Sequence, residues 1–320
     1  MTLSPAPLFA DLAEAPAQTR AWWVDASDGL RLRVMHAPSQ GARGTVLLFP
    51  GRTEYVEKYG RAAAVLAQAG YDTLAIDWRG QGLAGRMLDE PRTGHVDVFE
   101  DYQADVAALV AAADELGVPG PRHLIGHSMG GCIGLRALMG GLDVRSAVFT
   151  GPMWGIRLGH VMRPAAWALS RLSKPLGMSH RFAPGTGAMP YVAASAFADN
   201  TLTRDPEMWD YMRRQVMAHP ELQLGGPSLN WLHEALAETR HLARQPSPPV
   251  PCICYTGTNE RIVDVTRIRD RMDRWPQGRL EMVAAGEHEL MMEIPATRDR
   301  VFAGMVDLFD ANSGDQSLTA

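Results

Sequence analysis

The sequence predicts an α/β protein with a mostly parallel sheet of about eight strands and helices on both faces. In residues 45–150, and again in residues 252–309, short apolar runs alternate with segments of helical periodicity. Such runs are typical of strands that are buried on both faces of a parallel sheet. Between these stretches, residues 153–244 show no clear buried strand and contain tryptophans, many methionines and helix-breaking Gly/Pro clusters. We therefore expect a helical cap inserted between two strands of the sheet.

This pattern divides the 320 residues into a core and three further segments. We expect residues 21–152 and 245–312 to form the core and residues 153–244 to form the cap. Residues 1–20, rich in Ala and Pro, are expected to be extended, and the polar residues 313–320 to be a disordered tail. A chain of this length can hold one large domain with an insertion or two small domains.

Local signals place the individual elements of the core. The turn Ser27-Asp28-Gly29 predicts an antiparallel hairpin at the start. Continuous apolar runs predict the later strands. Gly70 ends the expected helix 54–68, and Gly117 ends the expected helix 98–116. In chain order, the expected strands are residues 21–26, 30–36, 45–49, 71–77, 122–126, 144–150, 252–256 and 279–283, and the expected helices are residues 54–68, 98–116, 129–139, 263–274 and 296–309.

Composition limits the classes of partner and the cellular compartment. The net charge is −5 with no long basic run, which gives no electrostatic case for nucleic-acid binding. Cys132, Cys252 and Cys254 all fall in apolar segments, so we expect buried free thiols, which suit a reducing cytoplasm. Because no second pair of ligands stands near the two strand cysteines, we expect no metal.

The N-terminal region carries no basic residue before Arg20 and no apolar core of signal-peptide length. No run approaches the roughly 18 apolar residues that a membrane-spanning helix needs. We therefore expect a cytoplasmic protein and leave open a peripheral contact with the inner membrane surface. The oligomeric state is also left open.

The motif Gly126-His127-Ser128-Met129-Gly130 joins the strand 122–126 to the helix 129–139. A strand that turns directly into a helix strains its middle residue and projects that side chain from the sheet. The helix N-terminus then favours negative charge beside the serine. Ser128 is therefore the expected nucleophile, and the side chain of His127 is expected to point away.

A serine nucleophile needs a base and a third group that orients the base, in the α/β-hydrolase order Ser, Asp or Glu, His. His288 follows the strand 279–283 and is the expected base. The acid should follow the strand 252–256, where Glu260 and Asp264 are both available. We favour Glu260, because Asp264 stands where a helix N-cap is needed.

Two backbone N–H groups must stabilise the oxyanion. Met129, directly after the nucleophile, is one expected donor, and Arg52, after the strand 45–49, is the other. The Arg52 side chain can reach an anionic head group, but we expect it to form a structural ion pair, for instance with Glu54.

These residues also carry a family resemblance. Pro50-Gly51-Arg52-Thr53-Glu54-Tyr55-Val56-Glu57-Lys58-Tyr59, Asp77-Trp78-Arg79-Gly80-Gln81-Gly82, the Ser128 motif and Gly286-Glu287-His288-Glu289-Leu290 with Glu293 are the relevant stretches. They resemble the lysophospholipase L2 group of α/β-hydrolases, which is related to monoacylglycerol lipases and to serine aminopeptidase-like hydrolases. The resemblance covers roughly residues 25–310 and is weakest in the cap. It departs at Glu260, where relatives usually have Asp, and at Pro50, where His-Gly is usual.

The resemblance implies a serine hydrolase that cleaves a carboxylic ester of a lysophospholipid or monoacylglycerol without a cofactor. Apolar cap residues are candidates for the acyl pocket, Met153, Trp154, Met162 and Trp209 among them, although each is equally suited to packing the cap onto the sheet. Two other functions remain open. An aminopeptidase or amidase would need an acidic pair in the cap, where Glu207, Asp210, Glu221, Glu234 and Glu238 show no convergent spacing. A non-catalytic binding protein would leave Ser128 unreactive.

Overall fold

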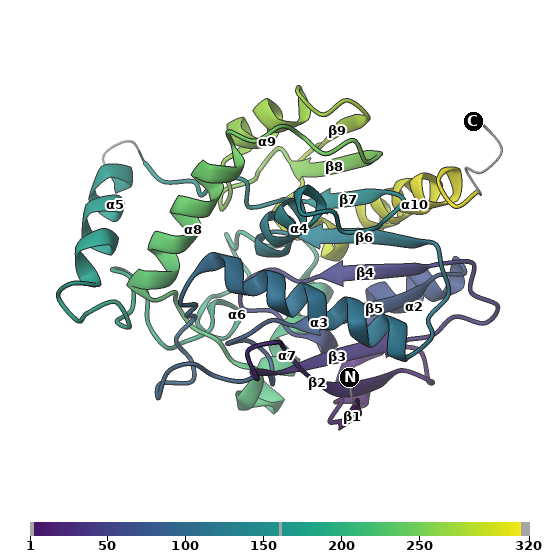
Figure 1. Ribbon diagram of the computed structural model, residues 1–320, viewed down its shortest axis with the longest axis horizontal. Helices are drawn as coiled ribbons and strands as arrows, with labels where there is room; N and C mark the ends of the chain where they lie inside the picture. The colour runs from purple at the N-terminus through teal and green to yellow at the C-terminus, as the bar shows by residue number, and fades with distance from the viewer. Residues whose placement is uncertain (1–2, 160–161, 315–320) are drawn as a thin grey trace.

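The computed structural model describes residues 3–159 and 162–314, which form a nine-stranded sheet with helices on both faces (Figure 1). The strand order is β1-β2-β3-β5-β4-β6-β7-β8-β9. The strands are β1 (Ser4–Ala6), β2 (Arg20–Asp25), β3 (Arg31–Ala37), β4 (Thr45–Phe49), β5 (Asp72–Asp77), β6 (Arg122–His127), β7 (Ala147–Thr150), β8 (Cys252–Gly257) and β9 (Gly278–Val283). Strands β5, β4, β6, β7, β8 and β9 pair in parallel, and β1, β2 and β3 are antiparallel.

The predicted fold class is confirmed, with one strand more than expected. The extra strand is β1, which lies in the segment that we expected to be only extended and pairs with the neighbouring strand β2. At three residues, β1 is too short to show an alternating pattern in the sequence. The continuous apolar run of β4 is buried at every position, as its central place in the sheet requires.

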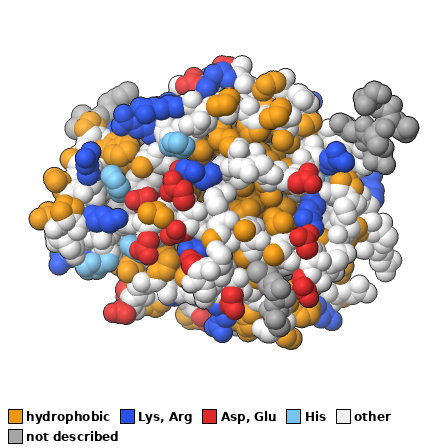
Figure 2. Space-filling model, in the orientation of Figure 1, with side chains coloured by type: hydrophobic (Ala, Val, Ile, Leu, Met, Phe, Trp, Pro, Cys, Tyr) orange, Lys and Arg blue, Asp and Glu red, His pale blue; other side chains and the backbone are white. Residues whose placement is uncertain are grey.

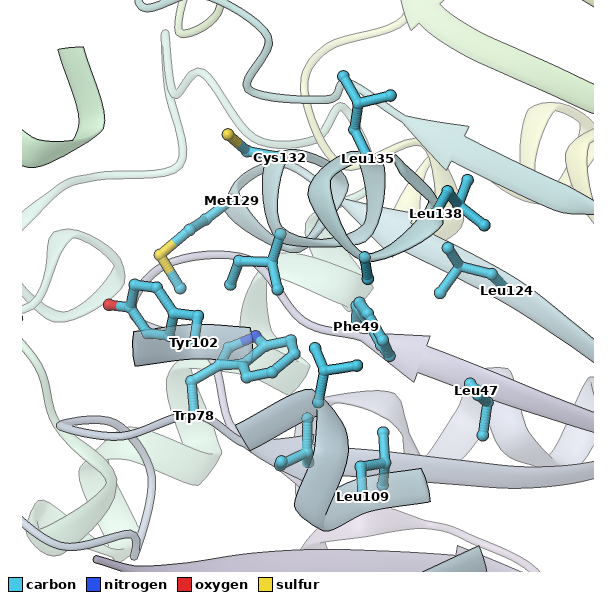
Figure 3. Close-up of a cluster of buried hydrophobic side chains, with 14 of the residues drawn as sticks. Leu47, Phe49, Trp78, Tyr102, Leu109, Leu124, Met129, Cys132, Leu135 and Leu138 are labelled. Carbon is cyan, nitrogen blue, oxygen red and sulfur yellow. The ribbon is translucent and has the colours of Figure 1, made fainter. Parts of the chain in front are cut away.

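Two hydrophobic clusters attach the core helices to the sheet. On one face pack α3 (Tyr102–Glu115), α4 (Met129–Met139) and α9 (Val265–Met272), and on the other pack α2 (Gly60–Gln68) and α10 (Pro295–Ala311). Figure 3 shows Phe49, Trp78, Tyr102 and Met129 converging between α3, α4 and the strand ends. Because these helices are held on both sides of β4 and β6, the ends of those strands are rigid supports for loops.

The helix expected over residues 54–68 begins later than predicted. Tyr55 is extended, the 3-10 helix η1 spans Val56–Tyr59, and α2 starts at Gly60. Similarly, the 3-10 helix η2 (Phe99–Asp101) precedes α3. Glu54 is therefore not on a helix surface, and its side chain is buried.

The inserted segment between β7 and β8 contains α5 (Met162–Ser173), α6 (Tyr191–Ala194), α7 (Pro206–Ala218), the 3-10 helix η3 (Pro220–Leu222) and α8 (Leu229–Leu242). Helices α5 and α8 lie beyond the carboxyl ends of the parallel strands (Figure 1). The short α1 (Ala10–Ala13) and η4 (Leu290–Met292) complete the elements. No helix among the described residues is long and apolar enough to cross a membrane.

Of the tail expected over residues 313–320, residues 315–320 lie outside the described residues. Ser313 lies just beyond the end of α10, where its hydroxyl donates to the Phe309 carbonyl oxygen at 2.8 Å. The three cysteines are free and buried, as expected from their apolar surroundings.

Candidate active site

Ser128 lies at a sharp bend between β6 and α4. Its φ of 50° and ψ of −116° are strained for a residue with a side chain. The Ser128 N–H donates to Thr150 O at 3.1 Å, and its carbonyl accepts from Gly131, Cys132 and Met153. These bonds hold the strained conformation, so the serine side chain projects at the carboxyl end of the sheet.

Gly130 is required by the close approach of α4 to β4. A Cβ at this position would lie 2.0 Å from Phe49 O and 2.5 Å from Pro50 O, both of which are backbone atoms. The missing side chain therefore lets the N-terminus of α4 approach the end of β4, where the oxyanion loop begins.

His288 and Glu260 are brought together by the loops that follow β9 and β8. The His288 Nδ1 lies 2.6 Å from Glu260 Oε2. The other oxygen of Glu260 accepts from the N–H groups of Ile262, at 2.6 Å, and Val263, at 3.1 Å. Burial would raise the pKa of Glu260, but His288 and these N–H donors outweigh it and lower that pKa. A fixed, ionised carboxylate therefore orients the imidazole.

Asp264 has a different environment. Its Oδ1 accepts from the Thr266 N–H at 3.2 Å as the N-cap of α9, and its Oδ2 accepts from Arg163 Nη2 at 3.1 Å. Of the two carboxylates left open by the sequence, the structure brings only Glu260 to His288.

Ser128 and His288 line the same cavity, which has a volume of about 420 Å³. Their segments are also in close contact. Ser128 pairs with Thr150, and a Cβ on the next residue, Gly151, would lie 3.0 Å from His288 Nδ1. Gly151 is thus the small residue that allows the imidazole to approach the bend at Ser128.

Among the residues that the structure describes, the loop Gly51-Arg52-Thr53 has one N–H without a partner. The Gly51 N–H donates to Glu54, and the Thr53 N–H donates to Gln81 Oε1 at 3.2 Å. Within the described part of the chain, the Arg52 N–H has no acceptor. Met129 is the first residue of α4, so its N–H has no acceptor within the helix. These are the two N–H groups for which the sequence predicted a role in the oxyanion hole.

The expected ion pair between Arg52 and Glu54 is not formed. Glu54 instead accepts from Gly51, Lys58 and Tyr59, while Arg52 Nη1 donates to Gly225 O at 2.8 Å. The geometric reason is that Glu54 turns inward under the loop, whereas the Arg52 side chain extends toward the cap.

Sequence reasoning missed a buried cluster of charges beneath the site. Lys58 Nζ donates to Glu54 and, at 2.7 Å, to Glu289 Oε1. The His127 Nε2 lies 3.3 Å from Glu289 Oε2 and 3.5 Å from Glu54 Oε1. We expected the side chain of His127 to point away from the site. This prediction is wrong, because the centroid of its ring lies 4.9 Å from that of the His288 ring.

Mutual attraction sets the protonation of this cluster. Burial would lower the pKa of His127 and of Lys58, but Glu289 and Glu54 outweigh it and raise both pKa values. Burial would raise the pKa of Glu289, but His127 and Lys58 hold it well below the usual value. The charged forms of Lys58, His127 and Glu289 thus favour one another, and the cluster ties the oxyanion loop, the bend at Ser128 and the histidine loop together.

This cluster does not fit a metal ion. Glu54, His127 and Glu289 each place a ligand atom within 4.8 Å of the others. However, the Lys58 ammonium already binds both carboxylates, and an added divalent cation would be repelled by it. The signal that could have revealed the cluster was its adjacency to the motif, since His127 precedes Ser128 and Glu289 follows His288.

Of the four proposed pocket residues, Met153 lines the cavity. Trp154 instead packs between Phe149 and Trp275, and its indole N–H donates to Gly131 O at 3.0 Å. Trp209 belongs to a separate hydrophobic cluster, and Met162 is 60% exposed. None of these three is among the described residues that line the cavity. Trp154 packs against the sheet, Trp209 lies inside the cap, and Met162 is at the surface.

The apolar lining comes instead from both the core and the cap. It includes Met153, Ile156, Pro190, Tyr191, Val192, Leu202, Met212, Val216, Leu224, Pro227, Trp231, Leu232, Ile262 and Val263. The parallel sheet, the bend at Ser128 and the Glu260–His288 pair define the class of the protein as an α/β-hydrolase.

Comparison with known proteins gives the family. Residues 40–295 match the family Serine aminopeptidase, S33. Lysophospholipase L2 of Escherichia coli is 31% identical over 303 residues, which cover 91% of this chain and 88% of that protein. Monoacylglycerol lipase of Mycolicibacterium smegmatis is 26% identical over 241 residues, which cover 74% of this chain and 77% of that protein. The chain belongs to the Serine aminopeptidase, S33 family, and within this family it is related to lysophospholipase L2.

A solved structure supports the same fold. A soluble variant of monoglyceride lipase from Saccharomyces cerevisiae, in complex with a substrate analog, superposes with a TM-score of 0.72 at 22% identity. The match covers 91% of this chain and 95% of that one.

Proposed function

We propose that this chain hydrolyses carboxylic esters through an acyl-enzyme on Ser128. The observation that carries the proposal is the shared cavity, in which a serine at a strained bend lies with an imidazole held by a buried carboxylate. This combination makes a hydroxyl nucleophilic. The ester hydrolases among the relatives support the same reaction.

In the first half of the reaction, His288 Nε2 takes the proton of Ser128 as Oγ attacks the ester carbonyl. Glu260 accepts the Nδ1 proton of His288 in a hydrogen bond and stabilises the imidazolium. The N–H groups of Arg52 and Met129 stabilise the oxyanion. When the tetrahedral intermediate collapses, His288 gives its proton to the leaving alcohol.

In the second half, His288 removes a proton from water, which attacks the acyl-serine carbonyl. Collapse of the second tetrahedral intermediate breaks the bond to Ser128, and His288 returns the proton to Oγ. The products are a free fatty acid and the restored serine, so the cycle requires no cofactor.

The substrate class that we favour is a monoacyl lipid, either a lysophospholipid or a monoacylglycerol. Met153, Ile156, Met212 and Val216 line the cavity and supply an apolar surface for one acyl chain. The cavity volume of about 420 Å³ suits a single-chain ligand. The printed names of the relatives point to the same two classes of substrate.

An aminopeptidase is less well supported, because none of the five acidic cap residues considered for it is among the described residues that line the cavity, and three of them form ion pairs elsewhere. Glu207 pairs with Arg61, Glu238 with Arg136, and Glu221 with His219. The described acidic residues that line the cavity are Glu54 and Glu289, and Lys58 binds both. A substrate amine would therefore meet no free carboxylate in the described part of the site.

We also propose that the enzyme works in the cytoplasm and touches the inner membrane surface through its cap. From residue 144 to residue 198 the chain has basic side chains but no Asp or Glu. Leu172 and Leu176 in this stretch are 57% and 64% exposed. Figure 2 shows hydrophobic and basic side chains side by side at the end of the molecule where α5 lies. Such a surface favours anionic lipid, and the buried free thiols suit a reducing compartment.

Labelling with a fluorophosphonate tests the nucleophile. We expect the wild-type chain to be labelled at Ser128, and Ser128→Ala to lose labelling and to lower ester turnover by about 10³-fold or more. Circular dichroism and thermal unfolding of the variant serve as controls for the fold. Undiminished hydrolysis by a folded Ser128→Ala chain would rule the proposal out.

The choice of acid has its own matched pair of variants. Glu260→Gln should lower kcat by about 10²- to 10⁴-fold, because a neutral amide cannot stabilise the imidazolium. Asp264→Asn should change kcat little, since that side chain caps α9. A larger kinetic loss in Asp264→Asn than in Glu260→Gln would reverse the assignment.

A further inference from the structure

The Arg52 side chain lies on the seam between the oxyanion loop and the cap. It lines the same cavity as Ser128 and His288. Its Nη1 donates to Gly225 O at 2.8 Å, and its guanidinium lies 5.5 Å from the centroid of the Trp231 ring. A Cβ on Gly94 would come within 3.2 Å of Nη1, so the guanidinium is held between core and cap loops. One residue thus offers a backbone N–H to the oxyanion and a cation to the same cavity.

Arg52 has no carboxylate partner among the described residues. The buried Arg271 also lacks one, but it lies outside this cavity and donates to the backbone carbonyl oxygens of Gln245 and Leu242. Arg33 pairs with Glu57 and Asp77, and Arg79 pairs with Asp105. Burial lowers the pKa of Arg52 to about 10, and the opposing influence is the Tyr102 hydroxyl rather than an acid. The guanidinium remains charged at neutral pH.

The remaining charges of the cavity are already paired. Lys58 binds Glu54 and Glu289, and Glu260 accompanies His288. Within the described part of the chain, Arg52 is therefore the cavity's one cation without an acidic partner. The Arg52 side chain is partly buried, and shielding a cation from water without a counter-charge is unfavourable, so an anionic ligand would offset part of this cost.

We propose that the Arg52 guanidinium binds the phosphate of the substrate head group, which makes phosphate-bearing monoacyl esters the preferred substrate class. This inference rests on the proposed ester hydrolysis at Ser128. In a 1-acyl lysophospholipid, the number of bonds from the ester carbonyl carbon to phosphorus is similar to that from an arginine Cα to its Nη atoms. Because the Arg52 N–H holds the carbonyl oxygen, its side chain can span the glycerol to the phosphate. One carbonyl acceptor, Gly225 O, leaves most of the guanidinium donors for phosphate oxygens.

A purely structural role would also explain the contact with Gly225, so the test must separate the two. The measured quantity is the ratio of kcat/KM for a short-chain 1-acyl lysophosphatidylglycerol to that for the monoacylglycerol with the same chain. Both substrates are used below their critical micelle concentrations, so that binding to a lipid surface does not contribute.

Arg52→Met retains the backbone N–H and much of the side-chain length but removes the charge. We expect it to lower the ratio by roughly 10- to 100-fold, mainly through KM for the phosphate-bearing substrate. Arg52→Lys should restore part of the loss, because a lysine keeps the charge without the planar guanidinium. An equal fall in kcat/KM for both substrates, with the ratio unchanged, would overturn the proposal and leave Arg52 as an anchor for the cap loop.

Arg279→Met provides a matched control, since Arg279 lies on β9, pairs with Glu281 and is 62% exposed. We expect it to leave the ratio unchanged. A fall in the ratio similar to that of Arg52→Met would attribute the effect to net charge and contradict the proposal.

Inhibition experiments identify the source of the phosphate. Glycerophosphoglycerol should compete with the lysophospholipid in the wild-type chain and lose roughly tenfold or more in affinity in Arg52→Met. Inorganic phosphate should compete much more weakly. Equal inhibition by inorganic phosphate would overturn a head-group subsite in favour of a general anion site. If wild type cleaved neither ester and Ser128 were not labelled, the proposed function itself would fail.

Discussion

Helices α4 and α5 have opposite patterns of burial. Every residue of α4 except Arg136 and Met139 is buried, including Ile133 and Leu135. On α5 the buried side chains are Ser170 and Ser173, while Leu172 is 57% exposed. In α4, neighbouring backbone and side chains determine which residues fit. In α5, Leu169 and Leu172 face outward, so the packing of the fold does not determine which residues stand there.

The largest expected difference between the two regions comes from adding a methyl group. Gly130→Ala places a Cβ 2.0 Å from the Phe49 carbonyl oxygen, so β4 and α4 must separate. We expect the free energy of unfolding to fall by about 4 kcal/mol or more, measured by denaturant titration. Gly187→Ala in the cap meets nothing within 4 Å and should change it by about 0.5 kcal/mol at most. Equal effects would contradict the comparison.

The second expected effect concerns buried charge. Lys58→Met leaves Glu54 and Glu289 buried without the ammonium that binds both. We expect a loss of about 3–5 kcal/mol in the free energy of unfolding, because the uncompensated carboxylates are costly. Lys174→Met, at an exposed position in the cap, should change it by about 0.5 kcal/mol at most. A loss for Lys58→Met as small as this would show that the cluster does not hold the loops together.

The third effect depends on pH. The folded-state pKa of Glu289 lies well below its usual value of 4.5, so its stabilising contribution is complete above that pH and is lost as the pH falls through the folded-state pKa. Glu289→Gln should cost about 1–3 kcal/mol near neutral pH, and the difference from wild type should shrink in acid.

Chemical denaturation of both chains between pH 7 and about pH 3 measures this dependence. Glu281→Gln, whose side chain is 45% exposed, is the control and should show a small difference at each pH. A difference between wild type and Glu289→Gln that grew toward acid would have the wrong sign for this cluster.

The smallest expected effect on stability is in α5 and the residues after it. Leu172→Ser combined with Leu176→Ser should change the free energy of unfolding by about 0.5 kcal/mol or less, because both side chains are exposed. Binding to anionic vesicles, measured by sedimentation, should fall by about tenfold or more. By contrast, Leu135→Ser in α4 should cost about 3 kcal/mol. Unchanged vesicle binding by the double variant would remove the case for membrane contact through the cap.

The contrast between α4 and α5 also explains which parts of the molecule were predictable. We predicted the strand Thr45–Phe49 and the helix Met129–Met139 with the bounds that the structure shows. Both are buried elements, whose sequences are largely apolar and adjoin a glycine. The strand Ser4–Ala6 was missed, since three residues carry too little pattern. In the cap, Trp154 and Trp209 have the composition of pocket residues, yet they pack elsewhere.

Within the candidate site, Ser128, His288 and the preference for Glu260 over Asp264 came from the order of the elements. The cluster of Glu54, Lys58, His127 and Glu289 was not predicted from this order. Its members lie up to 235 positions apart, and each alone resembles an ordinary surface or loop residue. The burial of the four residues, and hence the pKa shifts of Lys58, His127 and Glu289, exist only when three loops meet.

The sequence alone predicted the parallel sheet, the bend at Ser128 and the loop that carries His288. Each of these features depends on a short stretch of chain, in which apolar runs and glycines act through local burial and steric fit. Folding in three dimensions decided which charges are paired. It joined Lys58 to Glu289, turned Glu54 under the oxyanion loop and left Arg52 facing the cavity with no acidic partner in the described part of the chain. Electrostatic interactions depend on distance through space and on exclusion of water, and neither of these is recorded along the chain.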